Sequence, residues 1–422
     1  MTSTTETRTA ETLTNWAGNI AFHPAAVHRP TSVAEVQELV AGSDRLRVLG
    51  SGHSFNPIAD TPGDLLVLAD MPPTVEVDTA RAQARVAGAV RYGELVGPLH
   101  AAGFALPNTG SLPHISVAGA CATGTHGSGV GNQVLATHVA AVELVRADGE
   151  LVTLRRGESG FEGAVLSLGA LGVVTHLTLD LVPTFDMTQV VHEGLTRAAL
   201  HENLDEVLAS AYSVSVFTDH RAGTGAQVWQ KRTSTAPAPQ EWLGAQLADG
   251  PRHPVPGEDP AACTTQGGVV GPWHERLPHF RLDFTPSSGE ELQSEYFVDR
   301  VHGAAALEAI EGLAEDMAPL LMISELRTVA ADDLWLSPAQ GRDSLALHFT
   351  WHADTPGVTA FLPRLEERLA ELDARPHWGK VNTVDPDVVR GLFPHLEDAR
   401  ALLHAHDPAG TLRNELVQRY LS

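Results

Sequence analysis

The segment Arg47-Val48-Leu49-Gly50-Ser51-Gly52-His53-Ser54-Phe55-Asn56 places a histidine in a glycine-rich turn that follows an apolar stretch. Gly50 and Gly52 let the backbone turn sharply and bring its N–H groups close to an anion, and His53 adds a nucleophilic imidazole. The turn is not a dinucleotide fingerprint, because Phe55 occupies the third glycine position of G-x-G-x-x-G and no amphipathic helix follows. Taken alone, the segment is also compatible with an ordinary strand-to-loop turn that carries a surface histidine.

A second segment, residues 107–129 (PNTGSLPHISVAGACATGTHGSG), is dense in small residues. It is unlike a core element packed by side chains, and it predicts backbone that passes close to a large flat ligand with phosphates. A flexible linker fits poorly, because Leu112, Ile115 and Val117 interrupt the segment. We expect His114 and His126 within it to be structural rather than catalytic.

Two later strands predict the floor of a polar pocket. In the first strand, period-two alternation places Glu325 and Arg327 on one face, and in the second it places His348 and Thr350 on one face. The opposite face of each strand is largely apolar. The alternatives are a surface ion pair and a solvated outer sheet face.

Together these segments resemble the vanillyl-alcohol oxidase family of flavoproteins and, within it, the alditol oxidases. The resemblance runs nearly end to end and includes residues 14–19 (TNWAGN), 272–276 (PWHER) and 377–380 (HWGK), the last of which sugar-lactone oxidases share. It implies an α+β fold with two domains. One is an α+β domain that binds FAD, and the other is a substrate domain with an antiparallel sheet and flanking helices.

The resemblance also implies an activity. Alditols of the xylitol and sorbitol type would lose a hydride from C1 to flavin N5 and give the aldose, with O₂ reduced to H₂O₂. An aldonolactone oxidase or dehydrogenase is the alternative enzyme. A flavin- or sugar-binding module without turnover is the alternative from another class.

In this family the histidine of the Ser-Gly-His-Ser turn carries FAD through the flavin 8α-methyl, which makes His53 the expected covalent (8α-histidyl) site. The other expected FAD contacts are Val48, Leu49, Gly50, Ser51, Gly52, Ser54, Ser111, Ser116, Gly119, Ala120, Cys121, Ala122, Thr123 and Leu171.

The positions that line the substrate site in alditol oxidases match Ser111, Glu325, Arg327, His348, Thr350 and Lys380. The expected catalytic residues are Arg327, Lys380 and Glu325. The two cations would stabilise the developing alkoxide, and Glu325 would accept hydrogen bonds from the polyol and hold Arg327.

Gly110 stands where the resembling oxidases often have alanine, beside the flavin edge that O₂ must reach. The missing methyl predicts more room for oxygen. The alternative is a turn that requires a positive φ.

The formal charge of −24 argues against nucleic acid and anionic membranes as partners, because both bind clustered Lys and Arg. No apolar run is long enough to span a membrane, and residues 1–7 (MTSTTET) lack an apolar signal core. Two distant cysteines, Cys121 and Cys263, argue against a disulfide framework. No pair of histidines with a nearby carboxylate has metal-ligand spacing, so we predict no metal. We therefore expect a monomeric cytoplasmic protein whose partners are a small polyol and O₂.

The elements that must position these residues follow from periodicity and turn chemistry. We predict a capping box at 32–35 that opens a helix, and a helix at 91–102 closed by Gly103. We predict strands at 45–49, 65–68, 75–78 and 177–181. A hairpin of 141–145 with 151–154 is predicted around a two-residue Asp148-Gly149 turn. Residues 233–275 predict a long loop or lid. Beyond them we predict strands at 294–298, 323–329 and 344–351 and helices at 304–317 and 357–372. The predicted division is an FAD-binding part at 1–185, a substrate domain at 186–375 and a C-terminal return to the FAD domain at 376–422.

Overall fold

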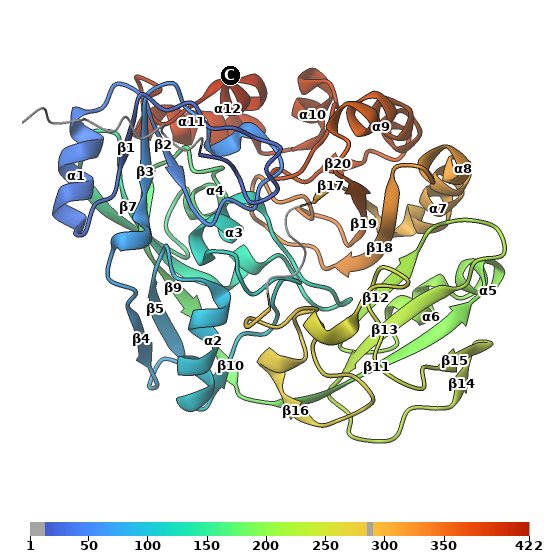
Figure 1. Ribbon diagram of the computed structural model, residues 1–422. Helices are drawn as coiled ribbons and strands as arrows, with labels where there is room; N and C mark the ends of the chain where they lie inside the picture. The colour runs from blue at the N-terminus through green and yellow to red at the C-terminus, as the bar shows by residue number, and fades with distance from the viewer. Residues whose placement is uncertain (1–12, 285–289, 422) are drawn as a thin grey trace, which may run out of the picture.

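The computed structural model describes residues 13–284 and 290–421, so the N-terminal segment 1–7 discussed above lies outside the described residues (Figure 1). Two sheets belong to the first part of the chain. A parallel three-stranded sheet has the order β1-β3-β2, and an antiparallel five-stranded sheet has the order β4-β5-β9-β7-β8. Their strands are β1 (Ala26–His28), β2 (Leu46–Leu49), β3 (Asp64–Val67), β4 (Val75–Asp78), β5 (Gln83–Ala87), β7 (Val139–Val145), β8 (Leu151–Arg155) and β9 (Val173–Asp180).

A larger, ten-stranded sheet follows with the order β14-β15-β11-β13-β12-β18-β19-β17-β20, and β16 pairs with β11 beside this path. All of its pairs are antiparallel. Its strands are β11 (Asp186–Leu195), β12 (Ser213–Thr218), β13 (Ala226–Arg232), β14 (Glu241–Trp242), β15 (Ala245–Leu247), β16 (Gly271–Pro272), β17 (Glu291–Asp299), β18 (Leu321–Val329), β19 (Ser344–His352) and β20 (Arg375–Pro376). A short pair, β6 (Phe104–Ala105) with β10 (Val182–Pro183), lies near the junction of the two parts.

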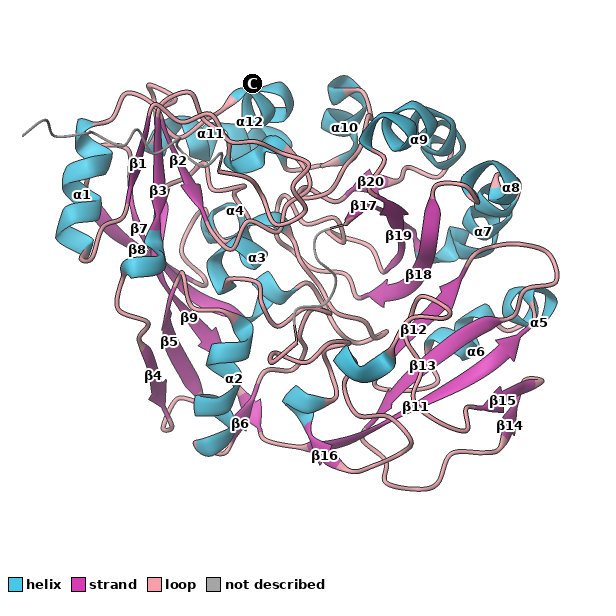
Figure 2. Cartoon of the chain, in the orientation of Figure 1, coloured by secondary structure: helices cyan, strands magenta, loops and turns pink. Residues whose placement is uncertain are grey.

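The helices flank these sheets (Figure 2). They are α1 (Val33–Gly42), α2 (Tyr92–Ala101), α3 (Val117–Thr123), α4 (Phe161–Ala164), α5 (Arg197–Glu202), α6 (Leu204–Leu208), α7 (Gly303–Glu311), α8 (Ala314–Met317), α9 (Thr355–Ala370), α10 (Pro386–Leu392), α11 (Leu396–His406) and α12 (Glu415–Leu421). The predicted α+β class is confirmed. Among the residues described, every helix is too short or too polar to cross a bilayer.

The first helix begins where the sequence predicts, because the Ser32 hydroxyl accepts from the Glu35 N–H. The second half of the predicted capping box is wrong. The Glu35 carboxylate accepts from the N–H of Thr31, at 2.8 Å, instead of from Ser32. Helix α2 also ends as predicted, with Gly103 at a φ of +84°.

The hairpin of β7 and β8 is confirmed, but its turn is longer than two residues. Val145 pairs with Leu151, and the Arg146 N–H donates to the Glu150 carbonyl, so the loop comprises residues 147–149. Gly149 takes a φ of +81° at its end, which is the usual pattern of a type I turn followed by a left-handed glycine.

The small-residue segment contains an element that the sequence reading missed. Helix α3 lies inside it and buries Val117, Ala120 and Cys121 in the core of the first part. The expectation that no packed core element forms there is therefore wrong for this helix. The rest of the segment, on either side of α3, is loop.

The predicted excursion at 233–275 is mostly loop, but it also forms the β14–β15 hairpin, which extends the edge of the large sheet. The predicted helix at 304–317 is interrupted, because α7 ends at Glu311 and α8 begins at Ala314.

One face of β18 and β19 packs on helices and the other faces a cavity. Leu326, Leu347 and Phe349 belong to the apolar core that also contains buried residues of α7 and α9. In Figure 2 these helices lie on the outer side of β17–β19. The polar residues between them therefore point inward, as the alternation predicts.

The C-terminal segment packs against the start of the chain. The buried Arg47 guanidinium, on β2, donates to the carbonyls of Ile58, Leu168, Gly169 and Leu412. A single side chain thus joins the strand before the glycine-rich turn to the last part of the chain.

Candidate active site

A cavity of about 570 Å³ opens between the first part of the chain and the inner face of the large sheet. Strands β17, β18 and β19 form its floor. Glu325 is directly opposite His348 in the β18–β19 register, and Glu295 is opposite His348 across β17 and β19. Because neighbouring strands lie side by side, three polar side chains reach the same point of the floor.

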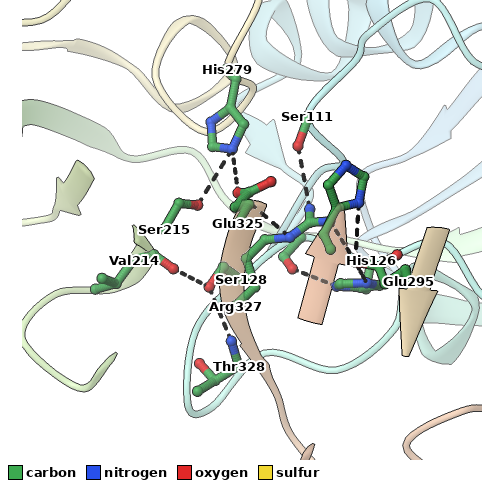
Figure 3. A network of polar contacts seen from close by, with 12 residues as sticks. Ser111, His126, Ser128, Val214, Ser215, His279, Glu295, Glu325, Arg327 and Thr328 are labelled. Atoms are coloured by element: carbon green, nitrogen blue, oxygen red, sulfur yellow. Dashed lines mark hydrogen bonds and ion pairs between the residues drawn. The ribbon is translucent and has the colours of Figure 1, made fainter. Parts of the chain in front are cut away.

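Glu295 is the centre of this floor. Its fully buried carboxylate lies 2.7 Å from Lys380 Nζ, 2.9 Å from Arg327 Nη2 and 3.2 Å from His126 Nε2. Figure 3 shows Arg327 and His126 converging on it. Burial raises the pKa of Glu295, but Lys380, His126 and Arg327 outweigh burial and hold that pKa well below its usual value. The residue is therefore an anion that holds both cations in place.

Glu325 is the second buried carboxylate, and its partners differ. His279 Nε2 lies 2.8 Å from its Oε1, and Arg327 Nε lies 3.5 Å from the same oxygen (Figure 3). Burial raises the pKa of Glu325, while Arg327 and His279 lower it further than burial raises it. Burial lowers the pKa of Arg327, but Glu325 and Glu295 raise it above its usual value, so the guanidinium stays charged.

Lys380 reaches the floor from the loop after β20. Its ammonium donates to Glu295 and, at 2.6 Å, to Nδ1 of His348, whose Nε2 lies 3.2 Å from the Thr350 hydroxyl. Burial lowers the pKa of Lys380, and Glu295 raises it only partly back. Burial and Lys380 lower the pKa of His348 to about 4, so this imidazole is neutral.

A second, narrower cavity adjoins the first along the glycine-rich turn. His53, Ile115, Thr125, His377 and Lys380 line both cavities. The Ser116 side chain packs closely against its wall, because a Cβ added at Gly50 or Gly119 would lie 2.7 or 2.8 Å from the Ser116 hydroxyl oxygen. A larger residue at either position would force this hydroxyl to move.

His53 lies where the two cavities meet. Its ring stacks on Trp16, with centroids 5.3 Å apart, and its Nδ1 is buried without a hydrogen-bond partner among the described residues. Burial, followed by His114, lowers the pKa of His53 to about 4. A neutral imidazole with a free nitrogen is a nucleophile, and a buried nitrogen without a partner is costly unless a bound group uses it.

The structure brings most of the predicted cofactor residues to the narrower cavity. Those that line it are Val48, Leu49, Gly50, Ser51, Gly52, His53, Ser54, Ser116, Gly119, Ala120, Ala122 and Thr123. Ser111, Cys121 and Leu171 do not line it. Cys121 packs in the core with its sulfur 3.9 Å from the Tyr92 hydroxyl, and Leu171 is fully buried in the same core.

All six predicted substrate residues line the larger cavity, namely Ser111, Glu325, Arg327, His348, Thr350 and Lys380. Ser111 accepts from Arg327 Nη1 at 3.3 Å. Gly110 is buried and lines neither cavity. A Cβ built on it would lie 3.4 Å from Thr125 and 3.5 Å from Ile115, which do line both.

Sequence reasoning missed Glu295, His279 and His377 and treated His126 as structural. The signal for Glu295 was available in the sequence. Gln293 and Glu295 alternate on β17 with residues that pack in the apolar core, just as Glu325 and Arg327 do on β18. The histidines come from loops, and only the fold brings them to the floor. In residues 13–284 and 290–421, no group of three His, Cys, Asp or Glu side chains is arranged to hold a metal ion.

Known proteins are similar to this chain in sequence and in fold. A family model described as an FAD binding domain matches residues 24–155, and one described as D-arabinono-1,4-lactone oxidase matches residues 289–420. An alditol oxidase of Streptomyces sp. (strain IKD472 / FERM P-14339) is 50% identical over 412 residues, which cover 97% of this chain and 99% of that protein. An L-gulono-1,4-lactone dehydrogenase of Mycobacterium tuberculosis (strain ATCC 25618 / H37Rv) is 28% identical over 96% of this chain and 98% of its own length.

Two solved structures share the fold at low sequence identity. Cholesterol oxidase from B. sterolicum superposes with a TM-score of 0.77 at 16% identity, over 97% of this chain and 96% of that one. Glucooligosaccharide oxidase from Acremonium strictum, described with a 6-S-cysteinyl, 8α-N1-histidyl FAD, superposes with a TM-score of 0.72 at 14% identity, over 97% and 94% of the two chains. These likenesses establish the fold alone.

Proposed function

The chain belongs to the alditol oxidases of the vanillyl-alcohol oxidase family of flavoproteins, and on that premise we propose how its residues carry out the reaction. The protein oxidises the terminal hydroxyl of an alditol to the aldose with FAD and reduces O₂ to H₂O₂. The 50% identity to an alditol oxidase over nearly the whole of both chains carries this conclusion. The lactone enzymes are more distant relatives.

The polyol would bind in the larger cavity with its terminal hydroxyl between Arg327 and Lys380. Both cations are buried and already oriented by Glu295, so they would stabilise negative charge that develops on the hydroxyl oxygen without reorganisation. Glu325 would accept a hydrogen bond from the polyol and orient Arg327. Ser111, His348 and Thr350 offer further polar contacts along the chain of hydroxyls.

The narrower cavity would hold FAD, which when bound accepts the hydride from the alcohol carbon and passes its electrons to O₂. The orphaned Nδ1 of His53 and the crowding around Ser116 fit such a group. We assign the covalent 8α attachment to His53 on the same observation. His53 lies at the junction of the cavities, so a flavin attached there would face the Arg327 and Lys380 side chains.

His53→Ala is expected to bind FAD only non-covalently or not at all, because the nucleophilic nitrogen is gone. Acid precipitation followed by mass measurement checks this: the native protein should stay yellow and carry the added mass of FAD. His23→Ala, at an exposed histidine, is the matched control and should retain the flavin. A native precipitate that is colourless and has the mass of the bare polypeptide would refute the covalent bond.

The activity is tested by anaerobic mixing with xylitol, sorbitol, a sugar lactone and a hydroxy acid while flavin absorbance is followed. Bleaching by the polyols and not by the lactone supports the alditol oxidase. Bleaching by the lactone alone would favour the lactone enzymes, whose family model matches residues 289–420. Flavin that stays yellow with every compound would favour a binding module without turnover.

Gly110 is proposed to leave room for O₂ beside the flavin edge. Its φ lies outside the left-handed region, so the alternative of a turn that requires positive φ is wrong. Gly110→Ala and Gly110→Val are expected to slow reoxidation of the reduced flavin progressively, because the added carbons fill space beside Thr125 and Ile115. Stopped-flow reoxidation by O₂ and melting temperatures check this. Gly97→Ala, at an exposed glycine with open space around it, is the control, and equal rates in all folded variants would make Gly110 a backbone residue only.

We also propose the division into an FAD-binding part at 1–185, a substrate domain at 186–375 and a C-terminal return at 376–422. The start of the ten-stranded sheet at β11 and the contact of Arg47 with Leu412 support it. We also propose that the protein is monomeric, which light scattering tests, and cytoplasmic, which cell fractionation tests.

A further inference from the structure

A buried lysine lies behind the wall of the larger cavity and takes no part in the roles assigned so far. Lys231, on β13, is 1% exposed and does not line the cavity. Its ammonium donates to the Leu277 carbonyl and lies 2.8 Å from Nδ1 of His279. No described carboxylate lies within ion-pair distance of this lysine, and a buried charge without such a partner is costly, so its placement calls for an explanation.

His279 connects this lysine to the floor of the cavity. Its Nε2 lies 2.8 Å from Glu325 Oε1 and 3.4 Å from the Ser215 hydroxyl (Figure 3). Its backbone N–H donates to the Ser111 carbonyl at 3.1 Å. The imidazole is buried among aromatic rings, with Phe217 and Trp229 edge-on at 5.5 and 5.6 Å. The ring is therefore fixed in orientation by its packing.

The contacts also fix the ring's tautomer. An ammonium has donors and no acceptor, so Nδ1 of His279 must be the acceptor toward Lys231. The single ring proton then resides on Nε2 and is donated to Glu325. Burial and Lys231 lower the pKa of His279 to about 4, which keeps the ring neutral and limits it to this one proton.

We propose that Lys231 and His279 are positioning residues for Glu325: Lys231 selects the Nε2–H tautomer of His279, and that donor holds Glu325 as an ionised acceptor for the substrate hydroxyl. The role of Glu325 toward substrate rests on the proposed function, whereas the order lysine to histidine to carboxylate rests on the contacts alone. The arrangement commits Oε1 of Glu325 to the protein and leaves Oε2 for the polyol.

The charged groups near Glu325 and near Lys231 are consistent with the order lysine, histidine, carboxylate. Arg327 and His348 also face Glu325, and Cys263, Glu325 and Arg327 lie near Lys231. Burial lowers the pKa of Lys231 to about 7, although Glu325 raises it. The tautomer survives loss of this charge, because the ionised Glu325 carboxylate has only acceptors and still requires the proton on Nε2.

Lys231→Met keeps the length of the side chain and removes the donor, so the proposal predicts a change in the pH profile of flavin reduction by xylitol. Without the donor and the charge, Glu325 binds its proton more tightly and its pKa rises. Reduction requires the ionised form and is lost as pH falls through that pKa. The acid limb should therefore move to higher pH by about one unit, a tenfold change in proton affinity.

His279→Leu should shift the acid limb in the same direction. His279→Gln, whose amide N–H keeps a donor toward Glu325, should shift it less. His192→Gln is the matched control, because His192 is a fully buried histidine of the same sheet that contacts the Pro239 carbonyl and, in the described part of the chain, no carboxylate. Its acid limb should coincide with that of the native enzyme. An unchanged limb in folded Lys231→Met would overturn the proposal, because a lysine that only fills space has no effect on proton affinity.

A second measurement does not depend on activity. In holoenzyme labelled with ¹⁵N-histidine, the ring signals lost in His279→Gln should show a protonated Nε2 and a bare Nδ1. A proton on Nδ1 would overturn the proposal even if xylitol reduces the flavin. Conversely, the expected tautomer with no bleaching by any polyol would leave the triad standing and reject the proposed function.

Discussion

Arg327→Met is expected to slow flavin reduction by xylitol about 10²–10³-fold, which is the usual loss when one preorganised donor to a developing oxyanion is removed. The guanidinium is buried, lies 2.9 Å from Glu295 and bonds Ser111, so it is already in place before substrate arrives. Methionine fills similar space without the charge. Lys380→Met should show a loss of the same order, since its ammonium reaches the same carboxylate, Glu295, from the loop after β20.

Stopped-flow reduction with xylitol and reoxidation with O₂, measured separately, check this prediction. Reduction should be slowed far more than reoxidation. Arg375→Met is the matched control: Arg375 is also buried, but it donates to the carbonyls of Leu392, Pro338 and Gln340, away from the cavity. Its loss should lower the melting temperature and leave reduction near the native rate. Near-native reduction in both Arg327→Met and Lys380→Met would exclude these cations from alkoxide stabilisation.

Glu295→Gln is expected to affect both stability and pH dependence. Removal of one partner from a buried ion pair typically costs about 3–5 kcal/mol, because the remaining charge stays buried without compensation. Here two cations, Arg327 and Lys380, lose the same carboxylate. We expect a lower free energy of unfolding in urea and a large loss of reduction rate.

The pH dependence has a definite sign. Lys380 acts as a cation, so activity is lost as pH rises through its pKa. Burial lowers that pKa and Glu295 raises it, so removal of Glu295 lowers it further and moves the alkaline limb of the reduction rate to lower pH. Glu311→Gln is the control, because Glu311 pairs with His201 beside α7, outside the cavity. If the alkaline limb stays in place in folded Glu295→Gln, Lys380 is not the group that titrates.

Those site residues whose side-chain direction depends only on alternation along a strand could be predicted from the sequence. Glu325 and Arg327 share a face of β18, His348 and Thr350 share a face of β19, and the register brings Glu325 opposite His348. Glu295 obeys the same rule on a strand that was also predicted. The family resemblance assigns no residue on β17, so side-chain alternation was the signal that pointed to Glu295.

Other parts could not be predicted from local pattern. Strands β11 and β13 are buried on both faces over most of their length, so they show no clear alternation, and β12 is likewise buried along nearly all its residues. Lys231 lies on one of them, and His279 comes from the loop that follows the excursion. Their contact joins positions that only the tertiary fold brings together. Helix α3 was missed for another reason, because its small side chains give little helical pattern in the sequence.

The clamp at Arg47 has a consequence for the order of events when the protein is made. The turn that carries His53 is held by the Leu412 carbonyl through Arg47 and by the Gly379 carbonyl, which accepts from the Phe55 N–H at 2.7 Å. Domains generally fold from the N-terminus as the ribosome extends the chain. Here part of the wall around His53 comes from His377, Gly379 and Lys380, so the narrower cavity is incomplete until the ribosome has passed this segment. Attachment of the proposed flavin is therefore expected only after residues 379 and 412 have been translated and have folded against the turn.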